Sequence, residues 1–112
     1  IRRNIECGIV LSGHSDMVPV DGQRWSSDPF DMARRDGRFY GRGTADMKGF
    51  IACVLALVPI IAERGLPGPI HLAFSDDEEV GCLGVSRMID VITAKVPMPY
   101  AVSSSASLRI CR

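Results

Sequence analysis

Three motifs with acidic residues follow one another along the chain, and the first of them contains a histidine. They begin at His14 (His-Ser-Asp), Asp46 (Asp-Met-Lys-Gly) and Asp76 (Asp-Asp-Glu-Glu). The intervals from His14 to Asp46 and from Asp46 to Glu79 are 32 and 33 residues, about the length of one strand–helix–strand unit. Parallel strands end at the same edge of a sheet, where α/β proteins keep their sites. We therefore expect His14, Asp46 and Glu79 to converge there, with Asp46 between the other two.

Residues of these types at such an edge are typical of a metal centre. A histidine with several carboxylates can hold one or two Zn²⁺-like ions and leave one carboxylate free as a base. Each motif also has a purely structural interpretation. A lone histidine after a strand is commonly a solvated loop residue, and Asp46 in the first turn of a helix would complement the helix dipole. The acids at 76–79 are harder to explain without an ion, since adjacent carboxylates repel one another and a bound cation offsets that repulsion.

Composition excludes several other classes of protein. The chain has 112 residues, with 13 basic and 13 acidic side chains, so its formal net charge is zero, whereas nucleic-acid binders carry a basic surplus. The four cysteines are far apart and lack Cys-x-x-Cys spacing, which indicates reduced thiols in the cytoplasm. The longest apolar stretch, 50–62, is too short to span a bilayer. We expect no nucleic-acid or membrane partner.

The pattern of apolar residues predicts an α/β fold with a parallel-containing sheet flanked by helices. Apolar runs predict strands, a helical period predicts helices, and Asp-Gly between two short segments predicts a β-hairpin. Thr44 is the expected helix N-cap, and Gly65 the expected helix end. The expected elements are strands at 7–13 and 69–75, a hairpin at 30–40, and helices at 45–64 and 85–94.

Taken together, the motifs resemble the zinc exopeptidase-like family of acetylornithine deacetylases, succinyl-diaminopimelate desuccinylases, aminoacylases and glutamate carboxypeptidases. The resemblance covers about residues 5–100, and the amino-acid sequences of the motifs favour the acetylornithine deacetylase branch. It implies a partial catalytic domain at 1–100 that removes the acyl group of an N-acyl amino acid in arginine biosynthesis. The segments that carry it are residues 11–20, 25–30, 36–49 and 75–81.

The resemblance also implies a role for each motif residue. His14 would bind one metal ion, and Asp16, in the catalytic set, would orient it. Asp46 would bridge two ions and Glu79 would bind the second. Glu78 would be the general base that takes a proton from water. The ions implied are Zn²⁺, Co²⁺ or Mn²⁺, all of which carboxylate-rich sites accept.

The chain departs from this family toward its end. The family has a further metal carboxylate and a distant metal histidine, but no acid follows Asp90 and no histidine follows His71. From the resemblance we expect each ion to keep two protein ligands and the family's lid domain to be absent. We expect residues 101–112 to be an atypical tail, disordered or frame-altered, and apolar surface to be left uncovered, which favours a homodimer. The alternatives to a deacetylase are a non-catalytic remnant or a related desuccinylase or carboxypeptidase.

Overall fold

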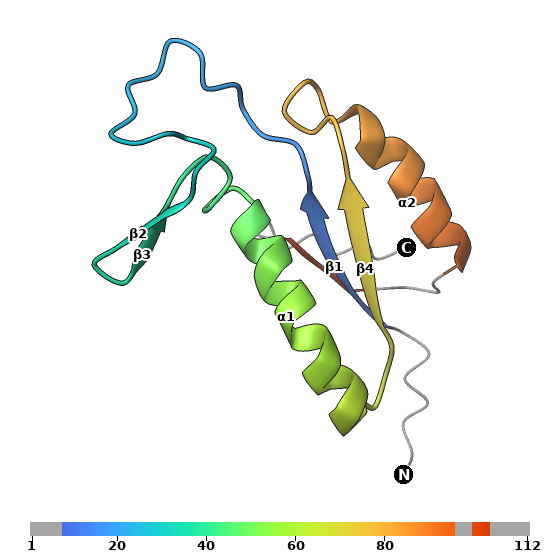
Figure 1. Ribbon diagram of the computed structural model, residues 1–112. Helices are drawn as coiled ribbons and strands as arrows, with labels where there is room; N and C mark the ends of the chain where they lie inside the picture. Colours follow the sequence, from blue (N-terminus) through green and yellow to red (C-terminus); the bar gives the residue numbers. More distant parts are fainter. Residues whose placement is uncertain (1–7, 96–99, 104–112) are drawn as a thin grey trace.

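The computed structural model describes residues 8–95 and 100–103, which form an α/β unit (Figure 1). A parallel sheet has the strand order β4-β1-β5, and a separate antiparallel hairpin joins β2 to β3. The elements are β1 (Ile9–His14), β2 (Ala33–Arg35), β3 (Arg38–Tyr40), α1 (Lys48–Arg64), β4 (Ile70–Ser75), α2 (Leu83–Lys95) and β5 (Tyr100–Ser103).

Strand β1 is the centre of the sheet. Ile9 is opposite Ile70 of β4 on one side and opposite Tyr100 of β5 on the other, and both pairings are parallel. Parallel neighbours need a crossover, and α1 supplies the one from β1 to β4. The chain then returns past β1 through α2 to reach β5. Because such crossovers are right-handed, α1 and α2 cover opposite faces of the sheet.

The two long strands and the hairpin lie close to where the sequence predicts them, and the sheet and its flanking helices confirm the expected fold class. The first strand extends one residue beyond its expected end, so that His14 is the last residue of β1 rather than the first residue of a loop. Helix α2 begins at Leu83, two residues earlier than expected. Strand β5 was not predicted. It includes 101–103 of the expected tail, whereas 104–112 lie outside the described residues.

The predicted start of α1 is wrong. The helix begins at Lys48, and Met47 occupies the N-cap position without a side-chain hydrogen bond. Thr44 does not cap it, because its hydroxyl donates to the Gly41 carbonyl oxygen at 2.9 Å within a turn. The first turn of α1 contains no acidic residue. Asp46 therefore precedes the helix, and the helix-dipole interpretation of this residue fails.

Helix α1 ends as predicted, at Gly65, whose N–H donates to the Ile61 carbonyl oxygen at 3.0 Å and whose φ is 67°. Pro59 lies inside the helix.

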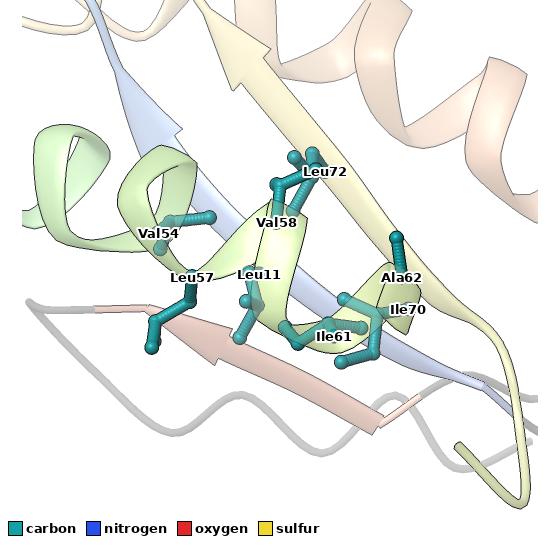
Figure 2. Close-up of a pocket in the computed structure, with 8 residues that line it drawn as sticks. All are labelled: Leu11, Val54, Leu57, Val58, Ile61, Ala62, Ile70 and Leu72. Atoms are coloured by element: carbon teal, nitrogen blue, oxygen red, sulfur yellow. The ribbon is translucent and has the colours of Figure 1, made fainter. Parts of the chain in front are cut away.

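Helix α1 is apolar on more than one side and buries only Val54. Between α1 and the sheet lies an apolar cavity of about 210 Å³, with side chains from both elements pointing into it (Figure 2). Other apolar side chains of α1 face outward, including Leu55, which is 51% exposed. Apolar surface is thus left uncovered, as expected. None of the helices in the described ranges is long and apolar enough to cross a membrane.

Candidate metal centre

The site begins where β1 and β4 end side by side. His14 and Ser75, the last residues of the two strands, are opposite each other in the sheet. Just beyond, the Ser15 N–H donates to the Ser75 carbonyl oxygen at 2.9 Å, and the Ser75 hydroxyl donates to the Gly13 carbonyl oxygen at 3.4 Å. These bonds fix the two strand ends relative to each other. The loops that leave them therefore start from a rigid edge.

His14 is the buried centre of the cluster, with 6% of its surface exposed. Its Nε2 lies 3.4 Å from Asp46 Oδ1 and 3.9 Å from Glu78 Oε2. One ligand atom each from His14, Asp46 and Glu79 lie within 4.8 Å of one another. The expected convergence is therefore observed: the last residue of β1 and residues from two separate loops meet at one edge of the sheet.

Asp46 is presented by a tightly folded loop between β3 and α1. Gly49 allows this fold, because a Cβ atom there would collide with the Thr44 carbonyl oxygen. The Gly49 N–H donates to the Gly43 carbonyl oxygen at 3.3 Å. The peptide bond between Asp46 and Met47 is cis. The two side chains have opposite environments, since that of Asp46 is 72% exposed whereas Met47 is buried.

Asp16 connects the histidine motif to the turn that follows β4 and contains the acidic residues 76–79, called the acidic turn below. Its Oδ1 lies 3.3 Å from His14 Nδ1, and its Oδ2 accepts a 2.9 Å hydrogen bond from the Glu79 N–H. The backbone N–H of Glu79, followed by that of Glu78 and the charge of His14, holds the pKa of Asp16 below its usual value although desolvation opposes the shift. Asp16 is thus ionised and in place to orient the His14 ring.

The acidic turn separates the two glutamates. Asp77 and Cys82 have positive φ values of 54° and 56°, which make the chain reverse sharply after β4. The Glu78 carbonyl oxygen accepts hydrogen bonds from Gly81 N–H and Cys82 N–H at 3.2 and 3.0 Å. Because the turn is tight, the carboxylates of Glu78 and Glu79 both lie close to His14.

The electrostatics of the cluster favour a cation. Burial alone would lower the pKa of His14, but the neighbouring charges of Glu78, Asp16 and Asp46 outweigh it, so the pKa is raised. Within the described ranges no lysine or arginine forms an ion pair with these carboxylates. His14 Nδ1 and Asp16 Oδ1 are buried without an aligned hydrogen bond. The excess negative charge around one imidazole is the environment that a divalent ion stabilises.

The donor set also fits a metal of the zinc type. Two ligand atoms bound to one tetrahedral ion at the usual Zn–N and Zn–O distances lie roughly 3.4 Å apart. The distance from His14 Nε2 to Asp46 Oδ1 is 3.4 Å. One imidazole and two carboxylates are ligands that Zn²⁺, Co²⁺ and Mn²⁺ share. The residues present therefore fit a divalent ion.

Met47 is a residue of this region that was not predicted from the sequence. The His14 N–H donates to the thioether sulfur of Met47 at 3.2 Å, and Met47 is the largest fully buried side chain in the described residues. A methionine between an aspartate and a lysine in a polar loop was the only sequence signal for this contact.

Comparison with known proteins agrees with this geometry. The family model described as peptidase family M20/M25/M40 matches residues 10–107. The chain belongs to this family. Members of the family are metal dependent, which agrees with the cluster formed by His14, Asp46 and Glu79.

Two known proteins are similar to this chain. Acetylornithine deacetylase of Pasteurella multocida (strain Pm70) is 45% identical over 84 residues, which are 75% of this chain and 22% of the relative. The crystal structure of human carnosine dipeptidase 1 superposes with a TM-score of 0.74 and 27% identity, over 88% of this chain and 22% of that one. The chain thus spans about a fifth of each relative's length, and its sheet, helices and hairpin match part of the family's catalytic domain.

Proposed function

We propose that a protein containing this chain is a metal-dependent amidohydrolase of the acetylornithine deacetylase type. It removes the acyl group of an N-acyl amino acid with water. The observation that carries the proposal is the convergence of His14, Asp46 and Glu79 within 4.8 Å, with the Glu78 carboxylate beside them. The 45% identity to a protein named acetylornithine deacetylase supports this substrate class.

The ligands would divide between two ions. His14 and Asp46 would hold one ion, Asp46 and Glu79 would hold the other, and Zn²⁺, Co²⁺ and Mn²⁺ are the candidates. Such ions, when bound, polarise an amide carbonyl and lower the pKa of water. Two ligands per ion are fewer than the three or four usual for zinc. The 112-residue chain by itself is therefore expected to bind metal weakly and not to turn over substrate.

The residues around the ligands supply the proton chemistry. Glu78 is the general base, because its carboxylate is only partly exposed and Oε2 reaches within 3.9 Å of His14 Nε2. It accepts a proton from the attacking water and returns it to the leaving amine. Asp16 orients the His14 ring through Nδ1, so that Nε2 faces Asp46 and Glu78.

N-acetylornithine is the first substrate to test, and arginine biosynthesis in the cytoplasm is the proposed setting. N-succinyl-diaminopimelate and dipeptides represent the related desuccinylases and carboxypeptidases. Nothing in the comparisons favours a non-catalytic remnant.

A chimera tests the proposal. The matched 84 residues of the Pasteurella multocida relative are replaced by the corresponding residues of this chain. Hydrolysis of N-acetylornithine is then measured with each divalent metal and after chelation. We expect metal-dependent turnover by the chimera and none by the 112-residue chain.

The control is the same chimera with Asp46→Asn, which retains the shape of the side chain but removes the bridging charge. Turnover that survives chelation, or a chimera that is folded but inactive with every metal and substrate, would contradict the proposal.

A further inference from the structure

The contact between Met47 and β1 is unusual in kind. Met47 is 1% exposed, and its sulfur accepts the backbone N–H of His14 at 3.2 Å. The next N–H along the chain, that of Ser15, donates to a carbonyl oxygen of β4 instead. A thioether is a weak acceptor, but a buried N–H without any acceptor costs considerably more. The sulfur therefore fills a specific position at the end of β1.

The methyl group of Met47 packs against Gly13. A Cβ atom at position 13 would lie 2.8 Å from Met47 Cε and 3.4 Å from its sulfur. Since real Cβ contacts of 2.8 Å essentially never occur, the methyl group occupies the space that a side chain at 13 would need. Gly13 and Met47 are thus fitted to each other next to His14.

Met47 is also fixed through its backbone. Its carbonyl oxygen accepts the Ile51 N–H at 3.1 Å in the first turn of α1. Its side chain is therefore anchored to β1, its backbone is anchored to α1, and its chain neighbour on the other side is Asp46. The carboxylate of Asp46 is largely in solvent, so the position of its backbone determines where it meets His14.

We propose that Met47 is a positioning residue for the metal centre: its thioether ties the Asp46 loop to the end of β1 and thereby sets the separation of Asp46 and His14. This inference rests on the proposed function and adds to it the means by which a ligand at the end of a strand and a ligand in a loop are kept 3.4 Å apart. Met47 does not contact metal or substrate in this scheme. It acts indirectly, on His14 through its sulfur and on Asp46 through the chain.

Met47→Leu in the 112-residue chain is the first test. Leucine fills nearly the same volume but offers no acceptor to His14, so the fold is kept while the anchor is lost. Co²⁺ is titrated and followed by paramagnetic broadening of amide signals, and hydrogen exchange of the His14 amide is measured without metal. We expect Co²⁺ affinity to fall about tenfold or more, as for other residues that support ligands, and His14 exchange to become faster.

Met32→Leu is the matched control, because Met32 is exposed on the surface and this substitution should alter neither measurement. Unchanged Co²⁺ affinity and unchanged His14 exchange in Met47→Leu would overturn the inference.

A double-mutant cycle with Gly13→Ala tests the same contact without relying on the sulfur. The added methyl group collides with Met47 Cε, so Gly13→Ala alone should weaken Co²⁺ binding. Leucine has no atom at the Cε position, which leaves room for the alanine methyl. The loss of affinity in Gly13→Ala/Met47→Leu should therefore be smaller than the product of the two single losses. A simple product would show that the two residues act independently.

The metal site and the positioning role of Met47 can be refuted separately. If the unmodified chain binds no Co²⁺ near His14, Asp46 and Glu79, the proposed metal site is wrong. The role of Met47 is then still decided by His14 exchange and by the same cycle measured as midpoints of thermal unfolding. If the unmodified chain binds Co²⁺ and the Met47 variants bind it equally well, the metal site stands and the positioning role is wrong.

Discussion

The carboxylate of Asp16 accepts a 2.9 Å hydrogen bond from the backbone N–H of Glu79, which lies 63 residues further along the chain. The other oxygen of the same carboxylate lies 3.3 Å from the ring of His14. One side chain therefore contacts the two candidate ligands that are furthest apart in sequence. The loop after β1 and the acidic turn after β4 are held together by this carboxylate as well as by the sheet.

Removing the Asp16 carboxylate should weaken metal binding although Asp16 is not proposed as a ligand. Asp16→Ala loses both contacts, and we expect Co²⁺ affinity to fall about 10- to 100-fold. Asp16→Asn should fall less, because its amide oxygen still accepts the Glu79 N–H but carries no charge. Co²⁺ titration of each variant measures this order. Asp21→Asn, at an exposed position, is the control, and an Asp16→Ala protein that binds like the parent would refute the orienting role.

The proposed base and the proposed bridging ligand should differ in what their loss removes. In the chimera, Glu78→Gln should retain metal affinity and lose hydrolysis about a hundredfold or more, because only the proton acceptor is gone. Asp46→Asn should instead lose metal affinity, since both ions would share this carboxylate in the proposed site. Metal titration and the rate of N-acetylornithine hydrolysis, measured on each variant, separate the two effects. A Glu78→Gln chimera at full rate would rule out Glu78 as the base.

The convergence of the three candidate ligands was easier to predict from the sequence than the local structure around them. The convergence of His14, Asp46 and Glu79 followed from spacing, because strand ends at one sheet edge restrict where the following residues can go. The start of α1 did not follow, since the Thr44 hydroxyl can bond either to a helix or to a turn, and the glycines at 43 and 49 allow the turn to close.

Two other features had no local signal. Strand β5 forms by pairing with β1, about 90 residues away, and its four residues carry too short a pattern to reveal a strand. The Met47 contact joins a side-chain sulfur to a backbone N–H. Such a bond cannot be predicted from secondary-structure propensity or hydrophobic periodicity. Both depend on tertiary contacts that form only once the sheet exists.

The raised pKa of His14 gives the metal-free protein a defined pH dependence. A pKa above the ordinary 6.5 means that the protonated ring is stabilised by the folded state. This contribution is fully present below about pH 6.5 and is lost as the pH rises through the folded pKa. The free energy of unfolding should therefore decrease over that range, and less so in His14→Asn, as measured by urea denaturation at several pH values.

Divalent metal should reverse the trend, because the ion binds only the neutral ring. With Co²⁺ present, the free energy of unfolding should increase with pH over the same range. A pH dependence that is identical in the parent and in His14→Asn would show that His14 does not cause it.

The apolar surface of α1 should make the 112-residue chain associate with itself. Leu55 and Ile60 are 51% and 45% exposed, and the cavity beneath the helix is lined only by apolar side chains (Figure 2). Exposed apolar patches of this kind favour association, so sedimentation equilibrium should detect a concentration-dependent dimer and a hydrophobic dye should bind. Leu55→Lys should weaken the dimer with little change in thermal stability, because the side chain is already half in solvent. Asp90→Lys, on the exposed surface of α2, should leave association unchanged. A parent chain that remains monomeric and binds no dye would show that the apolar surface of α1 does not cause association.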